Sequence, residues 1–506
     1  MNFYKTSILF SAFIYFLYPP QASADYYFAK EYIHSKQIQD QLTDAPATYR
    51  FSSRFDGKDS VSYHGQIFRQ ILINDLKKFM GTLERGRHNH TGDIQSSVDI
   101  MMDVLNSYFA YRSDNDNTAN PLVVNAMSSF SLSAKDKDQF PLPLGQEELP
   151  ISTYGELLGD GKNLLSKIAG NDNTVWERNL RRRELKGWGN SLLAIDLFTV
   201  DRDGAGDEYV EPEDLIDAFF RITAQLSVDG EDFLVPNGEL PAQSVSEAYI
   251  TENGLDLAQL TQKFLHGAVS FSQAASDYLY TGLSADNKTS YKDIHNYTAR
   301  EHHWDEAFGY FGAARNFMDY KADEKGDLDA DNNNLINIES EKILGVAKNT
   351  IRFDHNASPS ENLQINSFRA FVQGRYLLGT RPAGYEETTR LLAIIALGEW
   401  EKTIAATVIH YINRTMEQMD SYGTQLYSFK KHAKYWSEMK GHAMAAQFSP
   451  TAILSDSDFD YFHKLVGNHP ILGHQKGFAE YREQLIKARE VLTDAYKFSQ
   501  HNKENW

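Results

Sequence analysis

Apolar residues recur at three- and four-residue steps along most of the chain, a pattern typical of amphipathic α-helices. Helical periods of this kind cover residues 67–80, 164–169, 215–226, 257–271, 391–397 and 478–496. The alternation of apolar and polar residues that marks a half-buried strand is rare. We therefore expect an all-α fold, built as a helical bundle.

Segments rich in Gly, Pro, Asn and Asp separate these helical periods and predict loops. They cover residues 84–92, 114–121, 135–150, 228–245, 323–337 and 379–384. A weak division near residue 285 would give two packed helical halves, although no internal repeat supports it. We expect one all-α domain over residues 25–506.

The N-terminus has the features of a secretory signal peptide. Lys5 is followed by the largely apolar run 7–18, then by Pro19 and Pro20, and the segment 22–24 reads Ala-Ser-Ala. This run is too short to span a bilayer, and a small-residue triplet of this kind is a cleavage signal. We expect cleavage after Ala24 and a periplasmic or secreted protein.

Composition narrows the possible partners further. The formal net charge is −19, which argues against nucleic acid and against anionic membranes and favours cations. No later stretch has the roughly 18 uninterrupted apolar residues of a transmembrane helix. The chain contains no cysteine, so disulfides, zinc–thiolate sites and a lipid anchor on cysteine are excluded.

Residues 301–310 read Glu-His-His-Trp-Asp-Glu-Ala-Phe-Gly-Tyr and stand out from the ordinary helical pattern. Successive residues of a helix are about 100° apart, so Trp304, Phe308 and Phe311 share one face. Three aromatic side chains on one face predict that this side of the helix is buried.

A second face of the same helix carries titratable groups. His302, His303, Glu306 and Tyr310 fall together, and Gly309 beside them permits another helix to approach closely. His303 and Glu306 are one turn apart, near enough to share one ion. The pattern predicts a metal-ligating pair, and the alternative is an ion pair on the helix surface.

A similar pair lies later in the chain. Glu438 and His442 are four residues apart and therefore share a helix face with Tyr435. Carboxylates and histidines that face inward from several helices build the metal sites of helical bundles. We expect Glu438 and His442 to be partners of the first pair, and a surface ion pair is again the alternative. His463, by contrast, stands in a loop-like sequence and predicts a surface histidine.

Two acidic loops resemble calcium-binding loops. The first matches much of the EF-hand pattern, although its twelfth position is Ser340, so that Glu339 or Glu341 would have to supply the bidentate ligand. The second loop has irregular spacing, and solvated acidic turns are the alternative for both. The candidate calcium ligands are Asp329, Asp331, Asn333 and Asn337 in the first loop and Asp201, Asp203 and Asp207 in the second.

Together these segments resemble an uncharacterised family of exported bacterial helical proteins. The resemblance is carried by residues 51–70, 301–312, 327–341 and 434–450. That family is in turn distantly similar to the imelysins, all-helical envelope proteins tied to iron acquisition and once described as metallopeptidases. The imelysin G-x-H-x-x-E motif is matched at His303 and Glu306, whereas Glu301 stands where the glycine would be.

The leading hypothesis is an exported, non-enzymatic metal-binding protein. Mixed nitrogen and oxygen ligands suit iron, zinc or copper, and the resemblance to imelysins favours iron and a role in iron acquisition or storage. Calcium in the loop of Asp329 would be structural. One alternative is a metal-dependent hydrolase with Glu306 or Glu438 as general base; another is a calcium-stabilised binding or adhesion module. Protein partners in the envelope remain open.

Overall fold

The computed structural model describes residues 22–110, 163–170, 193–195, 211–321, 328–330, 332, 337 and 339–506. These residues are mostly helical, with a single two-stranded sheet, which confirms the predicted all-α class. In the described part of the chain no helix is long and apolar enough to cross a membrane. Most of the predicted signal peptide lies outside the described residues.

The elements are arranged along the chain as follows. Before residue 285 they are α2 (Ala22–Tyr32), α3 (Lys36–Leu42), α4 (His64–Met80), α5 (Ile94–Phe109), η2 (Leu165–Lys167), α10 (Pro212–Asp229), β1 (Phe233–Asn237), β2 (Leu240–Val245), α11 (Leu257–Leu265), η3 (His266–Phe271), η4 (Gln273–Thr281) and η5 (Gly282–Ser284). After it they are η6 (Tyr291–Asp293), α12 (Ala299–Phe311), η7 (Phe317–Asp319), α13 (Gly345–His355), α14 (Leu363–Thr380), α15 (Tyr385–Asp420), α16 (Phe429–Ala445), α17 (Asp456–Val466), α18 (Phe478–Tyr496) and α19 (Gln500–Asn505).

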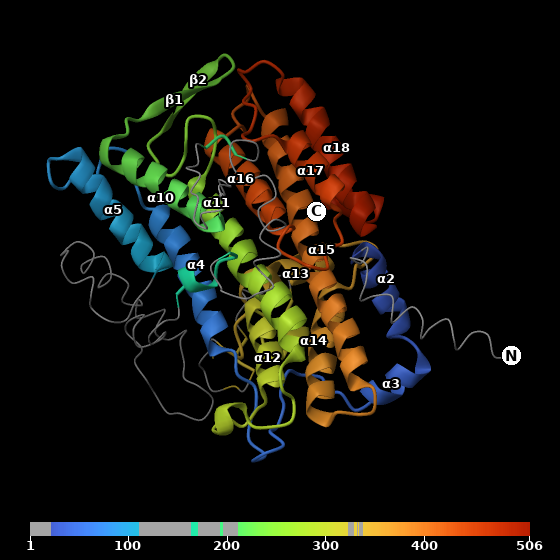
Figure 1. The fold of residues 1–506 in the computed structure, drawn as a ribbon. Helices are drawn as coiled ribbons and strands as arrows, with labels where there is room; N and C mark the ends of the chain where they lie inside the picture. The colour runs from blue at the N-terminus through green and yellow to red at the C-terminus, as the bar shows by residue number, and fades with distance from the viewer. Residues whose placement is uncertain are drawn as a thin grey trace, which may run out of the picture.

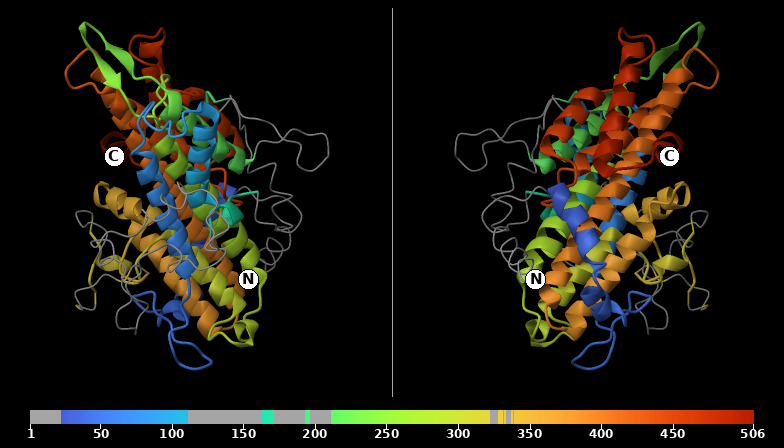
Figure 2. Two further views of the ribbon diagram at one scale, coloured as in Figure 1. Left: turned by 90° about the vertical axis from the view of Figure 1, so that its left-hand side faces the viewer. Right: turned by 90° about the vertical axis from the view of Figure 1, so that its right-hand side faces the viewer.

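Two long helical rods form the centre of the bundle. One is α15, which runs along most of the molecule, with α14 packed beside its first part and α16 beside its second (Figures 1 and 2). The other, called the central rod below, is the continuous helix formed by α11, η3 and η4, whose second part is π-helical. Helix α12 packs against η4, while α16 packs against α11 and η3. The segments that carry the two predicted His/Glu pairs therefore lie at different levels of the same rod.

The predicted aromatic face of α12 is buried. Trp304, Phe308 and Phe311 are each fully buried and surround Phe371 of α14. Close approach is possible because α14 has a glycine here: a Cβ on Gly374 would lie 1.9 Å from the Trp304 ring. Burying three such aromatic side chains contributes roughly 1.5–3 kcal/mol each and fixes which side of α12 faces the core.

The division predicted near residue 285 falls in the turn between η5 and η6. Tyr278 and Leu279 before this turn and Trp304 and Phe308 after it belong to one hydrophobic core. The main core also includes residues of α4, α14, α15 and α18.

Two sequence predictions were wrong in detail. The predicted loop 228–245 contains the antiparallel hairpin of β1 and β2, whose Val235 and Val245 are buried in a small separate cluster. The strands were missed because they are short and the hairpin bends at a β-bulge, which interrupts the alternation of buried and exposed residues. The predicted helix 164–169 is reduced to the single 3-10 turn of η2.

Candidate functional site

The N-terminus of α12 explains the glutamate that replaces the expected glycine. Thr298 and Glu301 form a capping box: the Glu301 amide donates to the Thr298 hydroxyl over 3.2 Å, and the Thr298 amide donates to the Glu301 carboxylate over 2.8 Å. These bonds satisfy two backbone donors that a helix start leaves unpaired. Glu301 therefore fixes the first turn of the helix that carries the histidines.

A buried arginine fixes the rotation of the same helix. The Arg375 guanidinium donates to the carboxylates of Glu301 over 3.0 Å and Asp305 over 2.8 Å, and the Tyr49 hydroxyl also donates to Asp305 over 2.7 Å. Burial tends to raise the pKa of the Glu301 carboxyl, but Arg375 and the Thr298 amide outweigh it, so this pKa lies below its ordinary value. Charged side chains this deeply buried are stable only as such a paired set.

On another face of α12, two imidazoles face one carboxylate. The Glu306 carboxylate oxygens lie 3.8 Å from His302 Nε2 and 3.3 Å from His303 Nδ1. The Gln66 side chain of α4 donates to the same carboxylate over 2.8 Å. The exposed fractions are 21% for the His302 side chain, 32% for His303 and 16% for Glu306. The group is therefore partly buried but within reach of solvent.

The backbone holds one of these imidazoles in place. His302 Nδ1 lies 3.1 Å from the Ser62 carbonyl oxygen, so it carries the hydrogen of this bond and leaves the Nε2 lone pair directed at Glu306. Burial lowers the pKa of His302 below its ordinary value. Burial alone would raise the pKa of Glu306, but the contacts with His303 and His302 lower it. At neutral pH the His302 imidazole is therefore neutral and the Glu306 carboxylate ionised, the forms of these two groups that bind metals.

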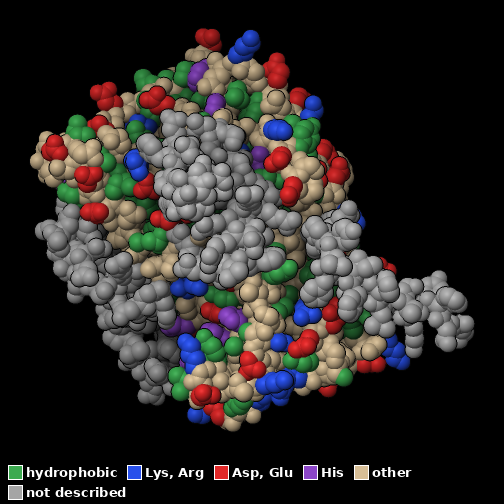
Figure 3. Space-filling view, in the orientation of Figure 1, with side chains coloured by type: hydrophobic (Ala, Val, Ile, Leu, Met, Phe, Trp, Pro, Cys, Tyr) green, Lys and Arg blue, Asp and Glu red, His purple; other side chains and the backbone are tan. Residues whose placement is uncertain are grey.

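Aromatic rings enclose this group. The His303 ring stacks on Tyr278 of η4 with 5.7 Å between centroids, and the His302 ring stacks on Tyr297 with 4.8 Å between centroids. In Figure 3, one cluster of histidine side chains lies in the lower half of the visible face, and other histidines lie separately near the top. Stacking restricts how far either imidazole can turn.

The second predicted pair lies in a different environment. Glu438 of α16 is buried, and its carboxylate lies 3.5 Å from the ammonium group of Lys263 on α11. The His442 ring stacks on Tyr411 with 6.2 Å between centroids. Burial, Lys263 and His266 lower the pKa of His442 well below its ordinary value. The carboxylate of this pair is thus neutralised by a lysine.

The structure places the two pairs apart along the central rod. The first pair contacts Tyr278 and the second contacts Lys263, fifteen positions earlier in one continuous helix. At about 1.5 Å of rise per residue these contacts are roughly 20 Å apart, too far for one ion to bridge. Among the described residues, no three His, Cys, Asp or Glu side chains are already placed to hold one metal ion, so a site at Glu306 that uses both His302 and His303 would require a side-chain movement.

The first acidic loop is closed by hydrogen bonds that use two of its candidate ligands. Both oxygens of the buried Glu341 carboxylate accept from the backbone, one from Ala330 and one from Asn337. The Asn337 side-chain oxygen accepts from the amides of Glu339 and Ser340. Asp329 is also described. The other calcium candidates, namely Asp331, Asn333, Asp201, Asp203 and Asp207, lie outside the described residues, and calcium binding stays a prediction.

One histidine prediction was wrong. His463, predicted at the surface, is buried in α17, and its Nδ1 lies 3.0 Å from the Lys440 ammonium nitrogen. The segment 456–466 forms an amphipathic helix whose Phe459 and Phe462 are buried beside it. Its helical period is too short to distinguish from a loop by sequence.

The most important residues that the site analysis of the sequence missed are Ser62, Gln66 and Arg375. Ser62 and Gln66 lie in the segment 51–70, which stands out in the sequence only by its resemblance to a family. That segment contacts α12 repeatedly, and its Gln70 side chain donates to the Gly309 carbonyl over 2.7 Å. The segments 51–70 and 301–312 resemble the same family, and this shared resemblance was the signal in the sequence that they form one structural unit. No comparable signal identified Arg375.

Residues 236–462 match a protein family described as "Domain of unknown function (DUF4856)". The match includes α11, α12, α15 and α16, and hence both His/Glu pairs, but not α4. It supports the expected uncharacterised family. No curated protein and no solved structure matches the chain.

Proposed function

We propose that this protein is an exported metal-binding protein, with a transition metal bound by His302, His303 and Glu306. The observation that carries the proposal is the convergence of two imidazole nitrogens on the two oxygens of one carboxylate. Export is proposed from the sequence of residues 1–24, and calcium at the loop of Asp329 is kept as an accessory proposal. The alternative of a metal-dependent hydrolase also requires a substrate groove beside the metal, and no observation favours it.

The spacing of these atoms is close to that of ligands on one ion. Two nitrogen or oxygen ligands about 2.1 Å from a tetrahedral ion are roughly 3.4 Å apart. The His303 contact of 3.3 Å has this length, and the His302 contact of 3.8 Å requires a small inward movement. Metal binding would supply the attraction that closes this gap.

The surroundings favour a metal over a simple ion pair. A metal-ligating histidine usually donates a hydrogen bond from its other ring N–H to a carbonyl or carboxylate, as His302 Nδ1 does to the Ser62 carbonyl oxygen. Gln66 likewise holds the Glu306 carboxylate. Two nitrogens and one carboxylate suit iron, zinc or copper and leave positions open for water. Iron is favoured by the resemblance of His303 and Glu306 to the imelysin motif.

The decisive experiment is elemental analysis of the full-length protein purified from its export compartment and exhaustively dialysed. The variant pair is His303→Ala/Glu306→Ala, which should lose the bound transition metal. The matched control is His64→Ala/Glu339→Ala, because these residues form another histidine–glutamate contact, 3.5 Å long. The control should keep its transition metal. Equal transition-metal content in wild type and in the His303→Ala/Glu306→Ala variant would refute the proposal.

A further inference from the structure

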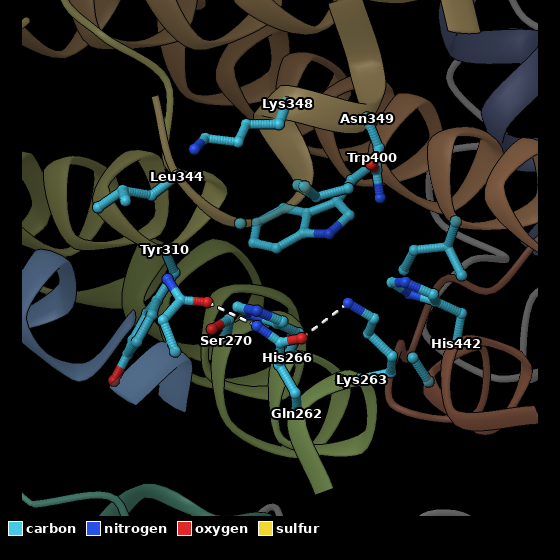
Figure 4. Close-up of a pocket in the computed structure, with 16 residues that line it drawn as sticks. Gln262, Lys263, His266, Ser270, Tyr310, Leu344, Lys348, Asn349, Trp400 and His442 are labelled. Carbon is cyan, nitrogen blue, oxygen red and sulfur yellow. Dashed lines mark hydrogen bonds between the residues drawn. The ribbon is translucent and has the colours of Figure 1, made fainter. Parts of the chain in front are cut away.

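A separate cavity of about 190 Å³ lies between the central rod, α13, α15 and α16. Figure 4 shows the indole of Trp400 above His266, with Lys263 on one side and Ser270 on the other. The exposed Lys348 lines its outer end, where water screens the charge of that side chain. None of the proposed metal ligands lines this cavity, so it is distinct from the metal site.

The charges in the inner lining of this cavity are balanced. The Lys263 ammonium group lies 3.5 Å from the carboxylate of the buried Glu438 and donates to the Gln262 side-chain oxygen over 2.8 Å. The two lining histidines are uncharged at neutral pH, because burial lowers the pKa of His266 to about 3 and that of His442 well below its ordinary value. The lining therefore favours an uncharged ligand, since a buried charge without a partner is unstable.

Three polar groups of the lining have no hydrogen-bond partner among the described residues. The Ser270 hydroxyl and His266 Nδ1 are buried and form no hydrogen bond. The indole N–H of the buried Trp400 also forms none, whereas those of Trp304 and Trp436 donate to a carbonyl oxygen and to a tyrosine hydroxyl. Leaving buried groups unpaired costs free energy, which a bound molecule with matching groups would recover.

Other parts of the lining are apolar, because Leu344 and Ile404 join the ring of Trp400. A ligand that matches the whole lining therefore combines several hydrogen-bonding groups with C–H groups. A ring sugar has this combination, since hydroxyls project from a ring whose faces carry C–H groups. A hydroxyl both donates and accepts, so it can pair with the Trp400 N–H, with Ser270 and with either tautomer of His266. An aromatic ring with one polar substituent would leave most of these groups unpaired.

We propose that this cavity binds an uncharged monosaccharide in its ring form, of the size of a pentose. Hydroxyls of the sugar pair with Trp400, Ser270 and His266, and its C–H groups pack against Leu344 and Ile404. The size is appropriate, because a cavity of about 150 Å³ holds the six-membered ring of benzene. The measured 190 Å³ adds room for hydroxyls on such a ring.

The test uses the full-length protein and three pentoses whose hydroxyls differ in configuration, namely D-xylose, L-arabinose and D-ribose, each titrated by calorimetry. We expect saturable binding of at least one pentose with a Kd of about 1 mM or tighter. Tetrahydropyran-2-methanol, a six-membered ring ether with a single hydroxyl, should bind at least about tenfold more weakly than the best pentose. Absence of saturable binding by all three pentoses, or a smaller preference over the ring ether, would overturn the proposal.

Variants locate the site. Ser270→Ala should weaken binding of the best pentose about three- to tenfold, and the fold should tolerate it because this hydroxyl has no partner to lose. The matched control is Ser276→Ala: Ser276 is another buried serine of the central rod whose hydroxyl forms no hydrogen bond, but it does not line the cavity. The control should keep wild-type affinity. Equal losses in the two serine variants would overturn the proposal.

A second variant tests the donor on the facing helix. Trp400→Phe keeps an aromatic ring, removes the N–H and should also weaken binding about three- to tenfold. Should this variant fail to fold, Ser270→Ala keeps the test decisive. Unchanged affinity in both Ser270→Ala and Trp400→Phe would exclude this cavity as the binding site.

The result is separable from the proposed metal site. His303→Ala/Glu306→Ala should bind the best pentose with wild-type affinity, because neither residue lines the cavity. A loss of affinity in that variant, with none in Ser270→Ala, would place the sugar at the histidines and overturn the assignment to this cavity.

Discussion

The two His/Glu pairs of this protein look alike in sequence and differ in almost every physical respect. On α12, Glu306 faces two imidazoles and an amide, and no cation lies within ion-pair distance apart from those histidines among the described residues. On α16, Glu438 faces the ammonium group of Lys263, and His442 is buried against Tyr411. One carboxylate faces imidazoles and an amide, and the other faces a lysine.

The difference arises from what the neighbouring helix presents at each level. The central rod places Tyr278 beside α12 and Lys263 beside α16. A lysine next to a glutamate occupies the position of a positive ion, whereas a tyrosine ring leaves the histidine nitrogens directed at the carboxylate. Helical spacing of histidine and glutamate is therefore not sufficient to predict a metal site, because the residue on the facing helix sets the charge beside the carboxylate.

The surroundings of Glu306 depend on the orientation of α12 in the bundle. This orientation depends most strongly on Arg375. Arg375→Met should lower the free energy of unfolding by about 3–5 kcal/mol, because the buried carboxylates of Glu301 and Asp305 would lose their partner. Arg390→Met is the control: Arg390 and Glu387 form a surface pair in which both side chains are more than half exposed, and its loss should cost about 1 kcal/mol or less. Urea unfolding measures both; equal losses would contradict the structural role of Arg375.

The difference in metal affinity is the next largest effect. Glu306→Gln should weaken zinc binding about 100-fold, because a charged ligand is replaced by a neutral amide. Glu438→Gln should change zinc affinity by about twofold at most, since Lys263 already occupies the space beside that carboxylate. Competition with a chromophoric chelator measures both affinities. A larger loss in Glu438→Gln than in Glu306→Gln would reverse the comparison.

The environment of α16 should also be visible in the pH dependence of stability. Burial lowers the pKa of Lys440 from 10.5 to about 7. Between these values the unfolded chain keeps a proton that the folded protein has lost, so stability rises with pH, by up to about 1.4 kcal/mol per pH unit. Urea unfolding at about pH 7 and about pH 9 should show this rise in wild type and not in Lys440→Met. An identical rise in the variant would assign it to other groups.

The smallest effect concerns the close packing that brings Gln66 to Glu306. A Cβ on Gly309 would lie 2.6 Å from Tyr63 Cβ and 3.0 Å from Gln66 Cβ, so Gly309→Ala should cost about 1–2 kcal/mol by separating α12 from α4. Gly379→Ala, where the nearest atoms are 3.9 Å away, should stabilise by roughly 0.5–1 kcal/mol. Thermal unfolding measures both variants. Equal shifts in their melting temperatures would show that α12 can move away from α4 without cost.

Much of the fold was predictable because it depends on local periodicity. The helix predicted at 478–496 coincides with α18, and the aromatic face of Trp304, Phe308 and Phe311 is buried as expected. The hairpin of β1 and β2 was not predictable, because short strands with a bulge lack a regular alternation. The buried position of His463 was missed for a similar reason, since a single short helix carries little periodic signal.

The sequence by itself determined the helical class, the two faces of α12 and the position of His303 and Glu306 on one turn, because these follow from residue spacing within a single helix. Only the tertiary structure decided that Ser62 and Gln66 support this pair, that Lys263 neutralises Glu438, and that Glu301 and Asp305 hold Arg375. These contacts join residues that are 70 or more positions apart in the chain. Spacing along one helix says nothing about which side chain stands opposite, and that neighbour sets the charge and the chemistry of each site.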